Sequence, residues 1–350
     1  DFISYPYEWS FPALKAAALL HLDIQLRSIK HNIVLSDATA YNIQFQGAKP
    51  IFIDHLSFRP YVEGEFWLAH RQFCEQFLTP LLLRSYLGVA YNNWYRGSLE
   101  GISLTDTAKL LPLRACFSYQ TLANIILPAR LENSNSKKSN QDVSEKIKNK
   151  KLPRQAYIGL LDGLKSMILK LEPKAGKTVW EDYQKNNTYD DDEALHKKAF
   201  ISEFVQTTKA DKLWDIGCNA GEYSEVAIAA GTRLVVGFEY DQGALELSYQ
   251  RAINNNLNFL PLYLDLANPS PSQGWNQSER PGIYQRRCAD GLVALAIIHH
   301  LCIGRNIPLV DAVHWLVKLA PNGVIEFVPK SDSMVQELLK LREDIFYNYS

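Results

Sequence analysis

Apolar residues in the first part of the chain recur mostly at helical intervals. Residues 11–29 and 66–86 have the spacing of helices that bury one face. Between them, residues 43–45 and 51–53 are two short strand-like runs joined by a turn that contains Gly and Pro. The pattern therefore predicts a mainly helical region, 1–132, that one hairpin interrupts.

Residues 133–154 have a different composition. They are rich in Lys, Asn and Ser and contain few large apolar side chains. Such a segment buries too little apolar surface to offset the entropy that is lost when a chain is ordered. We expect a flexible polar linker, with contact between its basic residues and a phosphate-bearing partner as the alternative.

From residue 155 to residue 350, short apolar runs alternate with amphipathic segments. Alternation of this kind is typical of an α/β fold in which helices cover both faces of a doubly wound, mostly parallel sheet. Five strands are predicted, and the fifth leaves an edge of the sheet exposed. The expected strands are 213–216, 234–239, 259–264, 292–298 and 324–328, and the expected helices are 222–230, 244–255, 310–319 and 335–341.

Composition and charge narrow the class of protein. The chain has 350 residues, 47% of them hydrophobic and 21% charged, with a formal net charge of -1. This balance gives no electrostatic reason to expect a nucleic-acid partner, and no apolar run approaches the roughly 18 residues of a membrane helix. The five cysteines have no paired spacing, so we expect a cytoplasmic protein without a metal site. Both ends of the chain, the C-terminal one above all, are expected to be truncated.

The segment 213–222 carries the most specific chemical signal. A predicted strand runs into Asp215, Gly217, Asn219 and Gly221, and a helix is predicted to follow. Glycine permits close approach of a ligand to the backbone, and a helix N-terminus offers unused N–H groups. Dinucleotide sites have the pattern GxGxxG at this turn. An acidic residue at the strand end would repel a pyrophosphate, whereas it suits a cationic amino-acid group.

Two further acidic residues end the next two predicted strands. Glu239 lies about 20 residues after the glycine turn, where a carboxylate accepts hydrogen bonds from both ribose hydroxyls. Asp265 is placed to accept a hydrogen bond from an adenine amino group, and the backbone of Leu266 to donate one to a ring nitrogen. In an open α/β sheet these strand ends lie on the ligand side.

In this order the three segments resemble the first three motifs of class I S-adenosylmethionine-dependent methyltransferases. The resemblance implies a Rossmann-like fold, S-adenosylmethionine as the cofactor, and a cofactor site formed by Asp215, Gly217, Asn219, Gly221, Glu239, Asp265 and Leu266. The alternative is a Rossmann-like domain that binds another nucleotide or none.

A wider resemblance spans nearly the whole chain. The sequence is similar to the NoeA-type nodulation protein methyltransferases in residues 38–45, 52–54, 71–74, 268–275, 298–301 and 326–330. This resemblance leaves the methyl acceptor open. The chain lacks an Asn-Pro-Pro-Tyr or Pro-Cys segment after the fourth predicted strand, so we expect a small-molecule, glycan or protein acceptor and not a nucleic acid.

Candidate residues for methyl transfer follow the fourth and fifth predicted strands. His300 and His299 have side chains that can take up a proton near neutral pH. Glu326 and Lys330 are expected in the acceptor pocket, together with Tyr183 from the segment that precedes the first strand. The structural alternatives are helix capping by the histidines, an ion pair for Glu326 and helix packing for Tyr183.

The N-terminal region contains a second candidate constellation. Asp37, Asn42 and Asp54 are spaced like a catalytic carboxylate and two magnesium ligands of a phosphotransferase. The region resembles a fragment of a kinase C-lobe, although Ser36 and His55 depart from the kinase pattern. A nucleotide-binding N-lobe would have to precede residue 1. The alternative function is thus a bifunctional or degenerate kinase-like phosphotransferase fused to a methyltransferase-fold binding module.

Overall fold

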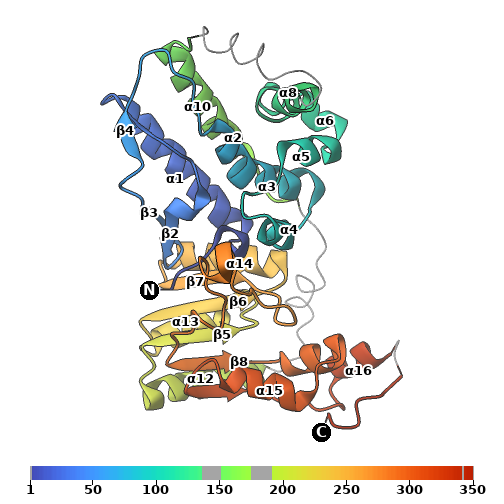
Figure 1. Ribbon diagram of the computed structural model, residues 1–350. Helices are drawn as coiled ribbons and strands as arrows, with labels where there is room; N and C mark the ends of the chain where they lie inside the picture. The colour runs from blue at the N-terminus through green and yellow to red at the C-terminus, as the bar shows by residue number, and fades with distance from the viewer. Residues whose placement is uncertain (1, 136–150, 175–190, 341–342, 350) are drawn as a thin grey trace. The chain divides into compact units, whose positions relative to one another are not determined.

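The computed structural model describes residues 2–135, 151–174, 191–340 and 343–349, which form two compact units (Figure 1). The first unit contains residues 5–44 and 50–135 with 151–174. The second contains 2–4, 45–49 and the described residues from 191 onward. Most of the predicted linker, residues 136–150, lies outside the described part of the chain.

The first unit is built on two long helices. Helix α1 (Phe11–Ile29) has the predicted bounds and begins where the Ser10 hydroxyl accepts a hydrogen bond from the Ala13 N–H. Helix α10 (Arg154–Lys170) packs along α1, and the Gln25 side chain donates to the Tyr157 hydroxyl at 2.8 Å (Figure 1). The domain boundary predicted at 155 is therefore wrong for α10. The spacing of the apolar residues in α10 indicates that one face of the helix is buried. It does not indicate which element packs against that face.

The other elements of this unit are short. The predicted hairpin is present as β2 and β3, although its residues 45–49 belong to the second unit. The helix predicted from residue 66 begins at His70 and alternates α-helical with π-helical turns as far as Leu87. Strands β1 and β4 form a second, antiparallel pair. The bounds are β1 (Ile33–Leu35), β2 (Ile43–Gln46), β3 (Lys49–Phe52), β4 (Phe58–Pro60), α2 (His70–Phe73), α3 (Thr79–Leu82), α4 (Asn92–Gly97), α5 (Leu104–Leu110), α6 (Leu113–Cys116), α7 (Tyr119–Thr121) and α8 (Leu127–Asn135).

The second unit is the predicted α/β fold. Its five strands are all parallel and lie in the order β7-β6-β5-β8-β9. The order changes direction between β5 and β8, which is where open α/β sheets bind ligands at their carboxyl edge. The bounds are β5 (Lys212–Ile216), β6 (Leu234–Glu239), β7 (Phe259–Tyr263), β8 (Gly291–Ala294), β9 (Asn322–Ile325), α12 (Asp191–Thr208), α13 (Glu222–Ala229), α14 (Gln242–Asn254), α15 (Leu309–Val317) and α16 (Ser333–Leu339).

The core of this unit includes the start of the chain. The ring of Phe2 packs edge-on against Trp214 of β5 and Phe238 of β6, with centroids 5.7 and 6.1 Å away. All three side chains are buried. Each such ring removes about 150–250 Å² of mostly apolar surface from water, so the N-terminal residues contribute to the stability of the sheet.

Two strands are shorter than predicted, which opens the carboxyl edge. Strand β8 ends at Ala294 instead of 298, and β9 ends at Ile325 instead of 328. Ala296 has φ +49°, which is incompatible with an extended strand. The Glu326 N–H still donates to the Ala294 carbonyl, while the Glu326 carboxylate accepts from the Ala296 N–H at 2.9 Å. Beyond this pair of bonds the two strands separate.

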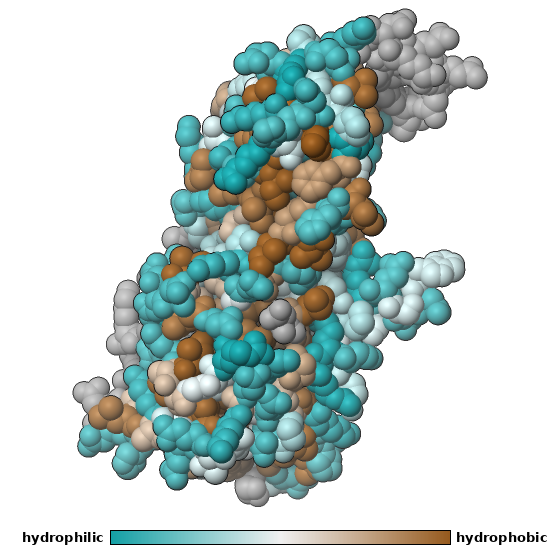
Figure 2. Space-filling model, turned by 90° about the vertical axis from the view of Figure 1, so that its left-hand side faces the viewer, coloured by the Kyte–Doolittle hydropathy of each residue, from teal (hydrophilic) through white to brown (hydrophobic). Residues whose placement is uncertain are grey.

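No helix in the described residues combines the length and apolar character needed to cross a membrane. The face in Figure 2 carries many hydrophilic side chains with hydrophobic ones between them. Apolar atoms are a normal part of any protein surface.

Candidate functional site

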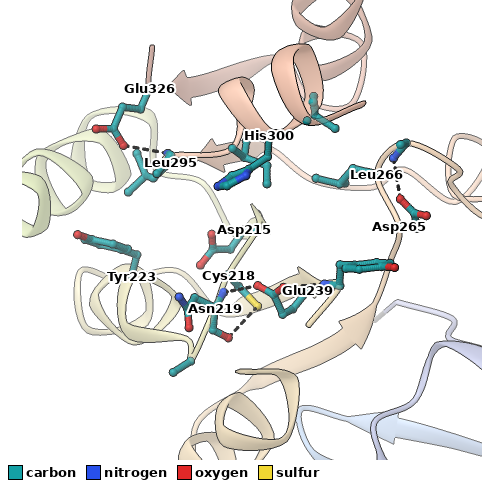
Figure 3. A pocket seen from close by; sticks show the side chains of 18 of the residues that line it. Asp215, Cys218, Asn219, Tyr223, Glu239, Asp265, Leu266, Leu295, His300 and Glu326 are labelled. Carbon is teal, nitrogen blue, oxygen red and sulfur yellow. Dashed lines mark hydrogen bonds between the residues drawn. The ribbon is translucent and has the colours of Figure 1, made fainter. Parts of the chain in front are cut away.

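A cavity of about 370 Å³ lies at the carboxyl ends of the five parallel strands (Figure 3). Every predicted cofactor residue except Gly221 lines it. His300 and Glu326 also line it, whereas His299 and Lys330 do not. Tyr183 lies outside the described residues. The lining consists of Lys197, Asp215, Gly217, Cys218, Asn219, Ala220, Glu222, Tyr223, Glu239, Tyr240, Asp265, Leu266, Ala267, Leu295, Ala296, Ile297, His300, Leu301, Gly304, Arg305 and Glu326.

The turn after β5 has a backbone that requires small or polar residues. Gly217 and Gly221 have φ values of +76° and +81°, and Asn219 between them has +48°. A Cβ atom on Gly217 would come within 3.2 Å of the Ile297 side chain, which also lines the cavity, and one on Gly221 within 2.6 Å of the Phe259 ring. Gly221 is therefore needed for the turn but does not line the cavity. Gly217 lines the cavity, and its lack of a side chain leaves space there for a ligand.

The carboxylate of Glu239 is held in place by backbone N–H groups. Its Oε2 accepts from Asn219 at 2.8 Å, and its Oε1 accepts from Tyr240 at 2.7 Å and Asp241 at 2.8 Å. A carboxylate has about four acceptor positions, so one remains, on Oε2. Desolvation raises the pKa of Glu239 to about 7, although the three N–H donors act in the opposite direction.

Asp215 is a buried carboxylate in the middle of the cavity (Figure 3). It accepts a hydrogen bond of 2.6 Å from the Ser224 hydroxyl of α13. Burial raises its pKa to about 6, against the effect of that bond. A cationic ligand group beside it would favour the ionised form.

The end of the cavity beside β7 contains a surface ion pair. Asp265 accepts from the Ala267 N–H at 3.0 Å and lies 3.3 Å from the guanidinium of Arg305. The Arg305 guanidinium also lies over the Tyr240 ring, 5.6 Å from its centroid. Leu266 adds an apolar side chain. This end therefore combines a hydrogen-bond acceptor with flat and apolar surfaces, which suits a planar polar ring.

The two predicted catalytic histidines differ in environment. His299 is buried, and its Nδ1 has no hydrogen-bond partner within the described part of the chain. The ring of His300 lines the cavity, 4.1 Å from that of His299. Burial, and secondly the neighbouring His299, lower the pKa of His300 to about 3. The expectation that this side chain takes up a proton near neutral pH therefore does not fit its surroundings, since the imidazole stays neutral.

Glu326 forms an ion pair, which was the structural alternative to a role in the acceptor pocket. The Lys197 ammonium of α12 lies 2.8 Å from its Oε1, and both side chains are largely buried. Lys330 instead pairs with Asp344 at 3.0 Å. Sequence reasoning missed Lys197, Tyr223 and Arg305. Tyr223 and Arg305 lie close in the sequence to predicted site residues, but no local pattern shows which neighbouring side chain faces a cavity, and Lys197 is far from the predicted residues in the sequence.

The first unit brings together the kinase-like residues. The Asn42 amide donates to the carboxylates of Asp37 at 3.0 Å and Asp54 at 3.1 Å. Burial, and secondly the charge of Asp54, raise the pKa of Asp37. Within the described residues there is no group of three His, Cys, Asp or Glu side chains that is placed to hold a metal ion. The cluster thus consists of two carboxylates and one amide.

Comparison with known proteins gives one close relative. No family model matches the chain. It is 47% identical to the nodulation protein NoeA of Rhizobium meliloti (strain 1021) over 349 residues, which cover 99% of this chain and 73% of the relative.

Similarity to solved structures is weak. Monomeric WbdD is 14% identical and covers 44% of this chain and 35% of its own, with a TM-score of 0.31. CalS10, an amino pentose methyltransferase from Micromonospora echinaspora, is 16% identical and covers 43% of this chain and 54% of its own, with a TM-score of 0.27. These scores are too low to indicate a function, whereas the identity to the rhizobial relative is high over nearly the full length. The chain belongs to the family of the nodulation protein NoeA, as its sequence resemblance indicated.

Proposed function

We propose that the second unit binds S-adenosylmethionine and transfers its methyl group to a small-molecule, glycan or protein acceptor. One observation carries this proposal: the glycine turn, Glu239 and Asp265 lie at the carboxyl ends of three adjacent strands and line one cavity. The bound cofactor would supply an electrophilic methyl group on a sulfonium.

The side chains fit the parts of this cofactor in the order of the strands. Asp265, after β7, would accept a hydrogen bond from the adenine amino group. Glu239, at the end of β6, would use its remaining acceptor position on Oε2 for a ribose hydroxyl. Asp215, on β5, would stabilise positive charge on the amino-acid part by a short-range electrostatic interaction. The lack of a side chain at Gly217 supports this fit, because a Cβ atom there would occupy part of the cavity.

His300 is the best candidate for a residue that contacts the methyl acceptor. Its ring lines the same cavity as Asp215 and is drawn beside it in Figure 3. A neutral imidazole has one nitrogen that accepts a hydrogen bond. We therefore assign it the role of orienting a hydroxyl or amine nucleophile, and not that of a base with a pKa near neutrality.

Calorimetric titration tests the proposed function. S-adenosylmethionine and S-adenosylhomocysteine are expected to bind with 1:1 stoichiometry, and NAD⁺ is expected not to bind. Burial raises the pKa values of Asp215 and Glu239 to about 6 and 7, so both carboxyl groups are partly protonated near pH 6.5. Binding that requires both carboxylates in the ionised form therefore releases protons. The observed heat should differ between two buffers of different ionisation enthalpy.

The sign of the pH dependence follows from the same two groups. A carboxyl group whose pKa is raised in the folded state contributes its full stability below its unfolded pKa of about 4, and this contribution is lost as the pH rises from there through the folded values of about 6 and 7. Cofactor affinity is expected to change in the opposite direction and to increase with pH over this range. Absence of binding at pH 8, where both carboxylates are ionised, would rule out the proposed function.

A divalent-cation site in the first unit is the second candidate function. Asn42 donates to Asp37 and Asp54 together, so the two carboxylates converge on one point. A cation there would replace the amide hydrogens and draw on oxygen ligands, which Mg²⁺ and Mn²⁺ prefer. This site supports the kinase-like alternative, in which the full protein transfers phosphoryl groups.

Electron paramagnetic resonance of Mn²⁺, with and without ATP, tests this site. We expect stoichiometric Mn²⁺ binding that Asp54→Asn abolishes, because one of the two carboxylates loses its charge. Asp162→Asn, on the exposed face of α10, is the matched control and should bind Mn²⁺ like the wild type. If the wild type leaves all Mn²⁺ free in both conditions, the second candidate function is wrong.

A further inference from the structure

The end of the cavity beside β9 is formed by the ion pair between Lys197 and Glu326. Lys197 and Glu326 are 20% and 23% exposed and both line the cavity. Glu326 is fixed, because its second carboxylate oxygen accepts from the Ala296 N–H at 2.9 Å. Lys197 has an ammonium group with three donors on a flexible stem, so it can bind a second anion while it keeps its contact with Glu326.

The strand order determines which part of the cofactor reaches this pair. Along the carboxyl edge, Asp265 follows β7, β6 ends at Glu239, and β5 leads into the glycine turn. A ligand with adenine at β7 and ribose at β6 therefore continues past β5 toward β8 and β9. In Figure 3, Glu326 and Asp265 lie on opposite sides of the cavity, with Asp215 between them. The amino-acid part would extend toward the Lys197–Glu326 pair.

The charges at this end favour a zwitterion only when Lys197 is present. Asp215, Glu222 and Glu326 contribute negative charge to the lining near Tyr223. They suit an ammonium group and would repel a carboxylate. Lys197 is the cation of the lining at this end, since Arg305 pairs with Asp265 at the other.

We propose that Lys197 binds the α-carboxylate of the cofactor's amino-acid part, while Glu326 holds the α-ammonium group. This inference rests on the proposed function and adds a cofactor-binding residue that precedes the glycine turn. The ion pair in the ligand-free protein keeps the Lys197 side chain in the cavity. It also satisfies Glu326, whose unpaired burial would be unfavourable.

The test compares two ligands that differ by the carboxylate alone. S-adenosylmethionine and decarboxylated S-adenosylmethionine are titrated into the wild type and into Lys197→Met by calorimetry. In the wild type we expect S-adenosylmethionine to bind about ten- to a hundredfold more tightly than the decarboxylated form, the value of a charge-assisted hydrogen bond. In Lys197→Met the ratio of the two dissociation constants should fall to about one or below. Lys197→Arg should retain most of it.

The neighbouring Lys198→Met is the matched control. Lys198 lies on the same helix, is 42% exposed and is 3.9 Å from Glu222, but it does not line the cavity. It should keep the wild-type ratio. Because the readout is a ratio within one protein, partial unfolding of a variant affects both ligands alike.

The outcomes separate the two proposals. If the wild type binds both ligands and Lys197→Met keeps the wild-type ratio, the carboxylate assignment is wrong and the proposed function stands. If the wild type binds neither ligand at any pH, both are wrong. If the ratio of the two dissociation constants falls to about one in Lys198→Met as well, the effect comes from the overall charge of α12. The proposed role of Lys197 is then wrong.

Discussion

Glu239→Gln is expected to weaken S-adenosylmethionine binding by at least about a hundredfold. The carboxylate accepts three backbone hydrogen bonds, one on Oε2 and two on Oε1. An amide has a single oxygen, so its NH₂ group would face either the Asn219 N–H or the N–H groups of Tyr240 and Asp241. Each buried donor left without a partner costs about 1–3 kcal/mol. The turn after β5 would therefore move away, and the acceptor for a ribose hydroxyl would be lost.

Calorimetric titration measures this loss, and thermal unfolding shows whether the variant folds. Glu203→Gln, at an exposed position of α12, removes the same charge far from these donors and should keep the wild-type affinity. Wild-type affinity in a folded Glu239→Gln protein would contradict the assignment of the ribose site.

Gly221→Ala is expected to lower the free energy of unfolding of the second unit by about 2–5 kcal/mol. Gly221 has φ +81°, a left-handed conformation that an L-residue adopts at a cost of about 1–2 kcal/mol. A Cβ atom would also come within 2.6 Å of the Phe259 ring. That ring is buried and belongs to β7, so it cannot move without repacking, which costs about 1–3 kcal/mol.

Urea denaturation measures the change, and Gly231→Ala is the control. Gly231 has φ +121°, and a Cβ atom on it would meet nothing within 4 Å. Gly231→Ala should therefore lower the free energy of unfolding through backbone strain alone, without a contribution from steric overlap. Adding Phe259→Leu to Gly221→Ala should recover part of the loss, whereas equal effects of the two glycine substitutions would refute the role of the ring.

The element pattern of the second unit followed from the sequence because it depends on short-range chemistry. Alternating apolar strands and amphipathic helices predicted a parallel sheet, and the structure has five parallel strands. The glycine turn and the acidic strand ends were also visible, since left-handed backbone and chain reversal require particular residue types at fixed positions. In contrast, the predicted ends of β8 and β9 were too late, because Ala296 carries no local signal for a positive φ.

Features that depend on contacts between residues far apart in the sequence could be decided only by the tertiary structure. Helix α10 has a clear apolar face, but the period of a helix does not identify its partner, and it packs on α1. Lys197 is one of many lysines in the sequence, and it becomes a site residue only because the fold places it 2.8 Å from Glu326.

The side-chain chemistry of the cavity was decided in the same way. A histidine has a pKa near neutrality in water, and the burial of His300 lowers it to about 3. The sequence by itself determined which backbone turns and strand ends this protein has, because those are properties of neighbouring residues. The fold alone determined which charges face one another and how far each is removed from water, because proximity and burial arise when the chain is packed.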